Sequence, residues 1–113
     1  MHLWAVYLHR FRRSCNVVAC HCNQCCKTSS HYVSAISVDS DCLSICGEMT
    51  WFRSSDVAMR AFCGTCGSGL FWRREDSDQT SIFAGTFDGT TRLVTDKQLY
   101  PEDKGDYYDL LDV

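Results

Sequence analysis

The chain has 113 residues and a net charge of −3 at neutral pH, and this length suits one domain with a modest core. Hydrophobic residues make up 45% of the chain and aromatic residues 12%, which excludes a disordered polypeptide. The first 38 residues contain no acid, whereas the remainder carries fourteen acidic and seven basic residues. This acidic body argues against general nucleic-acid binding, and no apolar run approaches the roughly 18 residues of a transmembrane helix.

Short stretches of β-branched and aromatic residues alternate with polar turns along the chain, at a spacing of about 8–12 residues. The segment 57–62 is also compatible with a helix, but its apolar and β-branched ends favour a strand. Residues 28–30 are expected to form a polar turn, and the tail from Asp88 is turn-rich. No segment has the period of an amphipathic helix, so we expect a single all-β, mainly antiparallel domain over residues 1–113. The expected strands, in chain order, are residues 3–8, 16–19, 31–38, 42–46, 49–53, 57–62, 68–74 and 81–87.

Nine cysteines are a heavy load for this length, and an odd number cannot all pair within the chain. No convincing secretory signal opens the sequence, because the apolar run at residues 3–8 is short and its basic residues follow it. We therefore interpret the thiols as reduced and metal-bound in the cytoplasm, and not as a secreted disulfide scaffold. The basic, acid-free residues 1–14 also fit a mitochondrial presequence, although a first strand explains the same stretch.

Two cysteine motifs dominate the sequence. Cys20, Cys22 and Cys25 form a C-x-C-x2-C motif, and Cys63 and Cys66 form a C-x2-C motif followed by a glycine. A two-residue gap lets two thiolates on one tight turn bind the same metal ion at about 2.3 Å. Two such turns in one short chain predict bound Zn²⁺.

The spacing alone allows two arrangements of the metal. In the first, Cys20, Cys22 and Cys25 supply three thiolates and leave a fourth position for water or substrate, as catalytic zinc sites do. Zinc in such a site would act as a Lewis acid or hold a substrate thiol as its thiolate. The second is a closed structural site in a module that binds a protein partner without catalysis, and its ligands would be Cys22, Cys25, Cys63 and Cys66.

Several other side chains admit either a functional or a structural role. His21 could carry a proton in the site or simply cover the cysteine loop. Arg53 and Ser54 could bind a carboxylate of the substrate or form a solvated turn. Tyr107 and Tyr108 could line the rim of a pocket or pack the tail. The remaining expectations are structural: Cys42 and Cys46 as small buried residues, and an aromatic core of Trp51, Phe52, Phe62, Phe71 and Trp72.

The motifs extend beyond the cysteines and keep one order along most of residues 17–110. In that order the chain resembles the glutathione-dependent formaldehyde-activating enzymes, a family that also contains the centromere protein V group. The matching segments are Cys20-His21-Cys22-Asn23-Gln24-Cys25 with Lys27, Trp51-Phe52-Arg53-Ser54-Ser55, Phe62-Cys63-Gly64-Thr65-Cys66-Gly67-Ser68, Leu70-Phe71-Trp72, Ala84-Gly85 and Asp103-Lys104-Gly105-Asp106-Tyr107-Tyr108.

The resemblance implies a twisted, mostly antiparallel β fold with two zinc positions. It implies catalytic zinc on Cys20, Cys22 and Cys25, and structural zinc on Cys63 and Cys66 together with an earlier C-x-C pair. The implied reaction adds glutathione to formaldehyde to give S-hydroxymethylglutathione, and such enzymes are classed as carbon–sulfur lyases.

The sequence departs from this pattern at its N-terminus. Met1 and Leu3 stand where the earlier cysteine pair belongs, and neither is a useful zinc ligand. Cys15 is the nearest remaining thiol, and it could replace at most one ligand. The structural zinc is therefore the less secure of the two positions, and a truncated or divergent copy of the family would account for the departure.

Overall fold

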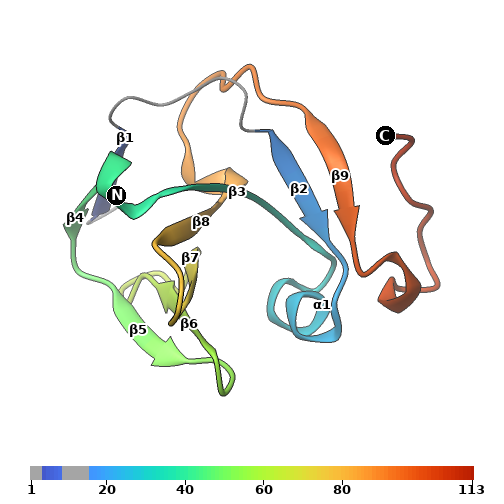
Figure 1. The fold of residues 1–113 in the computed structure, drawn as a ribbon, viewed down its shortest axis with the longest axis horizontal. Coiled ribbons are helices and arrows are strands. Elements are labelled where there is room, and N and C mark those ends of the chain that lie inside the picture. The colour runs from blue at the N-terminus through green and yellow to red at the C-terminus, as the bar shows by residue number, and fades with distance from the viewer. Residues whose placement is uncertain (1–3, 9–15) are drawn as a thin grey trace.

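In a computed structural model, the chain is described over residues 4–8 and 16–113. Strands β1 (Trp4–Leu8) and β4 (Leu43–Gly47) pair antiparallel as a small sheet. The larger sheet has seven strands in the order β5-β6-β7-β8-β3-β2-β9 (Figure 1). Its members are β2 (Val17–Cys20), β3 (Val33–Asp39), β5 (Thr50–Arg53), β6 (Ala58–Phe62), β7 (Gly69–Arg74), β8 (Gln79–Phe83) and β9 (Thr95–Leu99).

Helical segments are few and short. The α-helix α1 (Asn23–Ser29) follows β2, and three 3₁₀ turns occur elsewhere: η1 (Ser40–Cys42), η2 (Ala84–Thr86) and η3 (Pro101–Asp103). No helix in the described part of the chain is long and apolar enough to cross a membrane. Every pairing in the larger sheet is antiparallel except that of β2 with β9. The predicted all-β, mainly antiparallel fold is therefore confirmed, and residues 57–62 contain a strand.

Three predictions about local structure are wrong. The turn expected at residues 28–30 is the end of α1 and its C-cap. The sequence does not predict this helix, because its seven residues lack the apolar period of an amphipathic helix. The strand expected over 81–87 ends at Phe83 and continues as η2. The tail contains β9, whose polar sequence TDKQL has little intrinsic strand preference and extends by pairing with the backbone of β2. Predictions on residues 1–3 and 9–15, including Cys15 and the presequence, lie outside the described residues.

The core lies where β3, β6, β7 and β8 place their apolar side chains together. Ile36, Leu70, Phe71 and Ile82 are fully buried there. The expected aromatic core is only partly right, because Phe71 is buried, Phe52 is exposed and the other three aromatic residues are half-buried.

The expected burial of two cysteines is also wrong. Cys42 is half-buried and Cys46 is exposed. Within the described residues β4 pairs only with β1, so its end carries Cys46 beyond the core of the larger sheet.

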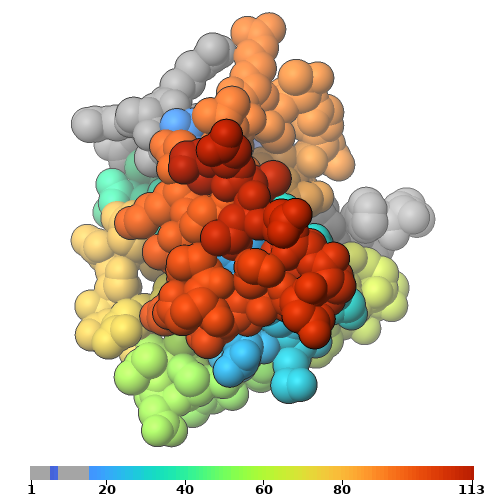
Figure 2. Space-filling view, turned by 90° about the vertical axis from the view of Figure 1, so that its right-hand side faces the viewer, coloured from blue at the N-terminus to red at the C-terminus, as the bar shows by residue number. Residues whose placement is uncertain are grey.

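The topology brings three distant segments to one end of the larger sheet. Strand β2 leads directly into the cysteine loop and α1, while β9 runs beside β2 in the same direction (Figure 1). The C-terminal segment that follows β9 turns back over this region, and Figure 2 shows it spread across one face of the molecule. This end of the sheet therefore holds the first cysteine motif and the tail together.

Candidate metal centre

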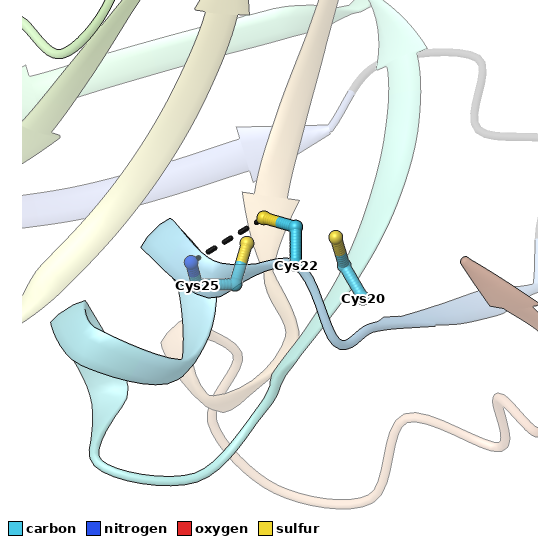
Figure 3. Close-up of side chains that lie close together, drawn as sticks. All are labelled: Cys20, Cys22 and Cys25. Carbon is cyan, nitrogen blue, oxygen red and sulfur yellow. Dashed lines mark hydrogen bonds between the residues drawn. The ribbon is translucent and has the colours of Figure 1, made fainter. Parts of the chain in front are cut away.

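The side chains of Cys20, Cys22 and Cys25 converge at the start of α1. Cys20 ends β2, Cys22 caps the helix, and Cys25 lies in its first turn. The helix cap is a hydrogen bond within the motif itself: the Cys22 Sγ accepts from the Cys25 backbone N at 3.4 Å. All three Sγ atoms lie within 4.8 Å of one another and face the same space (Figure 3). Cys25 is buried and the other two are half-buried.

The donor set fits a zinc ion. Tetrahedral zinc with Zn–S bonds of about 2.3 Å separates its sulfur ligands by about 3.8 Å, so the observed spacing needs only a small contraction. Thiolates are soft ligands that favour Zn²⁺ over Mg²⁺ or Ca²⁺. Three cysteines leave one position of a tetrahedron without a protein ligand, as in catalytic zinc sites.

The cysteines share protons unequally. A hydrogen bond from the Cys20 thiol stabilises the Cys25 thiolate and, with help from the Arg60 guanidinium, lowers the pKa of Cys25 to about 5. The same bond raises the pKa of Cys20 above its ordinary value. Burial raises the pKa of Cys22. At neutral pH the cluster therefore holds one thiolate and two thiols.

This distribution predicts how zinc binding depends on pH. The lowered pKa of Cys25 keeps it a thiolate down to about pH 5, so above that pH only Cys20 and Cys22 lose protons when zinc binds. We expect binding to release about two protons at pH 7, and zinc affinity to fall by about 100-fold for each unit that the pH is lowered between 8 and 6. Calorimetry in buffers of different ionisation enthalpy measures the protons released. A binding enthalpy that is the same in every buffer would contradict the expectation.

The second cysteine motif forms a separate turn. Cys63 is buried and Cys66 is exposed, and the Cys66 backbone N lies 3.5 Å from the Cys63 Sγ. Gly67 completes the turn with a φ of +79°, a conformation that favours glycine. Neither cysteine belongs to the cluster of Cys20, Cys22 and Cys25. The structure therefore does not bring together the four sulfurs of the closed site.

The His21 side chain contacts β9 and the tail. It is 1% exposed, and its Nε2 lies 2.6 Å from the Gln98 Oε1 and its Nδ1 lies 2.7 Å from the Tyr108 hydroxyl. Because the Gln98 Nε2 donates to the Leu111 carbonyl, the Gln98 Oε1 is the atom that accepts from the His21 Nε2–H, and the His21 Nδ1 forms a second hydrogen bond with the Tyr108 hydroxyl. This chain of hydrogen bonds ties the cysteine loop to β9 and to the tail.

A cluster of rings extends this contact. Tyr108 stacks on His21 with centroids 5.6 Å apart, and the Tyr107 hydroxyl lies 3.0 Å from the His31 Nδ1. The Lys104 Nζ fastens the turn by donating to the Tyr108 carbonyl at 2.6 Å. The two tyrosines thus pack the tail over the loop that carries the cysteines.

Gly105 allows this arrangement, and its replacement gives a testable prediction. A Cβ at Gly105 would lie 2.5 Å from the Tyr107 Cε1 and 2.9 Å from the Tyr108 Cε1, so the rings would have to move. We expect Gly105→Ala to reduce the free energy of unfolding by about 1–3 kcal/mol. Urea denaturation measures the loss. Gly85→Ala is the matched control, because a Cβ there meets nothing within 4 Å; equal stability of the two variants would contradict the packing described.

The two residues expected to contact substrate, Arg53 and Ser54, have different partners in the structure. The exposed Arg53 forms a salt bridge with Glu75, and its Nη1 donates to the Asp56 carbonyl at 3.2 Å. Ser54 lies closer to the cysteine loop, because its carbonyl accepts a hydrogen bond from the Gln24 Nε2 of α1 at 2.7 Å. Its hydroxyl is directed to the Ala58 carbonyl at 3.4 Å.

Sequence reasoning missed a different arginine beside the cluster. Arg60 of β6 is 4% exposed, and its Nη2 lies 3.5 Å from the Cys25 Sγ. It shares one face of its strand with Ala58 and Phe62, because alternate residues of a strand point the same way. An arginine between two apolar residues on a single strand face was the available signal.

Comparisons with known proteins agree with the motifs. A family model described as glutathione-dependent formaldehyde-activating enzyme matches residues 5–103, which is most of the chain. A search of curated proteins found no match.

Proposed function

The chain belongs to the glutathione-dependent formaldehyde-activating enzyme family, and we propose that it is a zinc-dependent enzyme of the carbon–sulfur lyase type. Its substrates would be a thiol such as glutathione and a small aldehyde such as formaldehyde. The observation that carries this proposal is the cluster of three sulfur atoms within 4.8 Å, which stands apart from the second cysteine motif. Three thiolates and an open fourth position suit chemistry, whereas a purely structural site is closed by four ligands.

The reaction itself is an addition. A carbon–sulfur bond forms, the π bond of the aldehyde breaks, and the proton of the thiol ends on the new hydroxyl group, so no leaving group or oxidant is needed. Zinc held by Cys20, Cys22 and Cys25 would supply Lewis acidity and favour the thiolate form of the substrate.

Two protein residues support the sulfur cluster: one stabilises its negative charge and the other holds its loop in place. The buried Arg60 guanidinium, 3.5 Å from the Cys25 Sγ, stabilises negative charge on the sulfur cluster. His21, held between Gln98 and Tyr108, fixes the backbone between Cys20 and Cys22. A fixed loop holds the sulfur atoms in one geometry during the reaction, and such positioning of the reacting groups raises the rate.

A direct assay tests the proposal. Zinc-loaded protein is mixed with glutathione and formaldehyde, and S-hydroxymethylglutathione is followed by exchange spectroscopy in the nuclear magnetic resonance spectrum. Because the addition also proceeds without protein, the measured quantity is the rate above the protein-free reaction. We expect a clear acceleration that disappears when zinc is removed by a chelator. A rate equal to the protein-free rate with zinc bound would contradict the proposal.

A further inference from the structure

His21, which stands between two of the clustered cysteines, is held at four points. Its backbone N donates to the Leu99 carbonyl at 2.9 Å, and its carbonyl accepts from the Cys26 Sγ at 3.3 Å. Its ring binds the Gln98 Oε1 through Nε2 and the Tyr108 hydroxyl through Nδ1. The residue is 1% exposed, so all four bonds are shielded from water. The backbone between the two cysteines is thus fixed by contacts from outside the sulfur cluster.

One of the four partners, Tyr108, belongs to the tail, which comprises residues 104–113. Two of the others lie in β9, which pairs with β2, and the fourth lies in α1. The tail also reaches the histidine through Gln98, whose Oε1 accepts from His21 and whose Nε2 donates to the Leu111 carbonyl at 3.2 Å. The tail therefore contacts the buried histidine directly through Tyr108 and indirectly through Gln98.

The tail itself is weakly anchored. It forms no helix or strand, and none of residues 104–113 is fully buried. Its Lys104 Nζ donates to the carbonyls of Gly105 at 3.0 Å and Tyr108 at 2.6 Å, and these bonds lie within the tail. A segment with few buried contacts opens at a much smaller free-energy cost than that of global unfolding. The tail can therefore leave the cysteine loop while the sheet stays folded.

Zinc and the docked tail favour the same conformation of the loop. Zinc binding requires the sulfur atoms of Cys20 and Cys22 to lie together, as they do in the structure. The tail requires the His21 ring between them in its place, because Tyr108 stacks on it and binds its Nδ1. When the hydroxyl leaves, a buried polar atom loses its partner, which favours other conformations of the loop. Two ligands that favour one conformation raise each other's affinity by the same factor.

We infer that zinc binding and docking of the tail are coupled, with Tyr108 as the positioning residue that connects them. Tyr108 strengthens zinc binding without contacting the ion, and bound zinc in turn holds the tail on the loop. A change that releases the tail therefore also weakens the hold on zinc. The inference rests on the zinc site of the proposed function, but it concerns retention of the metal and not the reaction.

Two neighbouring tyrosines give a matched pair of variants. Tyr108→Phe keeps the ring on His21 but removes the hydroxyl that binds Nδ1. Tyr107→Phe removes a hydroxyl that contacts His31 and Ser30, beyond the end of α1. We expect Tyr108→Phe to lower zinc affinity by about tenfold in a chelator competition, and Tyr107→Phe to bind zinc like wild type. Wild-type zinc affinity in a folded Tyr108→Phe protein would overturn the inference, whatever its loss of stability.

Proteolysis of the tail tests the reciprocal effect. Chymotrypsin cleaves after Tyr or Phe, so the site after residue 108 survives in both variants, and cleavage there requires the tail to be released. We expect saturating zinc to slow this cleavage by at least about tenfold in wild type and in Tyr107→Phe, and by less in Tyr108→Phe. A peptide of residues 104–113, cleaved with and without zinc, controls for effects on the protease. Cleavage in the wild-type protein that is indifferent to zinc would overturn the inference.

Both measurements are independent of catalysis. Coupling of zinc and tail in a protein that does not accelerate adduct formation would support the inference and count against the proposed function. Acceleration of adduct formation in a protein whose zinc and tail are uncoupled would overturn the inference alone.

Discussion

Replacing Cys22 by serine is expected to lower zinc affinity by at least about 100-fold and to reduce adduct formation to the protein-free rate. Changes to groups that only support a metal ligand already cost about 10–100-fold, and this change removes a ligand itself. The fold should survive, because serine is a good helix cap and can take over the hydrogen bond from the Cys25 backbone N. Chelator competition measures the affinity, and the glutathione–formaldehyde assay measures the rate.

Cys26→Ser is the matched control for this variant. Cys26 lies in the same helix but outside the sulfur cluster, and its Sγ donates to the His21 carbonyl at 3.3 Å, a bond that a serine hydroxyl can also make. We expect zinc affinity and rate close to those of wild type. Equal losses in the two variants would mean that the effect comes from α1 in general and not from a lost zinc ligand.

Phe71→Ala is expected to cause the largest loss of stability, about 3–5 kcal/mol in the free energy of unfolding. The side chain is fully buried in β7, next to Ala61 of β6 and Ile82 of β8. Its removal leaves a cavity in the centre of the sheet that positions Arg60. Since small domains are stable by only about 5–15 kcal/mol, the melting temperature should drop by more than about 10 °C. Urea and thermal denaturation at a fixed zinc concentration measure the loss.

Phe52→Ala provides the comparison for the core variant. Phe52 has the same side chain but is 40% exposed on the edge strand β5, so its removal deletes fewer contacts. We expect a loss of about 1 kcal/mol or less. Similar losses in the two variants would show that the centre of the sheet is not where the burial energy is concentrated.

Most of the fold was predictable because the signals are local. β-branched and aromatic residues between polar turns predict the strands of the antiparallel part. The helix α1 and the strand β9 gave no such signal. The helix is short and is stabilised by the Cys22 cap, and β9 is polar and depends on pairing with β2, a contact between residues about 80 positions apart.

The candidate site also combines a local feature that the sequence predicts with long-range contacts that it does not. The sulfur cluster follows from the spacing of Cys20, Cys22 and Cys25, which a single turn brings together. The contacts around it are long-range and could not be seen in the sequence: Arg60 comes from β6, and Tyr108 reaches His21 across 87 positions. Arg53, which the sequence suggested as a contact to a substrate carboxylate, instead forms a salt bridge with Glu75.

The central claim is that Cys20, Cys22 and Cys25 hold zinc with one position free for a light atom. X-ray absorption at the zinc edge tests it most directly, on protein loaded with one equivalent of zinc. The Cys63→Ser/Cys66→Ser double variant, measured alongside wild type, removes the second cysteine motif. We predict that the double variant retains zinc with three sulfur neighbours and one oxygen or nitrogen neighbour. Four sulfur neighbours in wild type that fall to two in the double variant would contradict the claim.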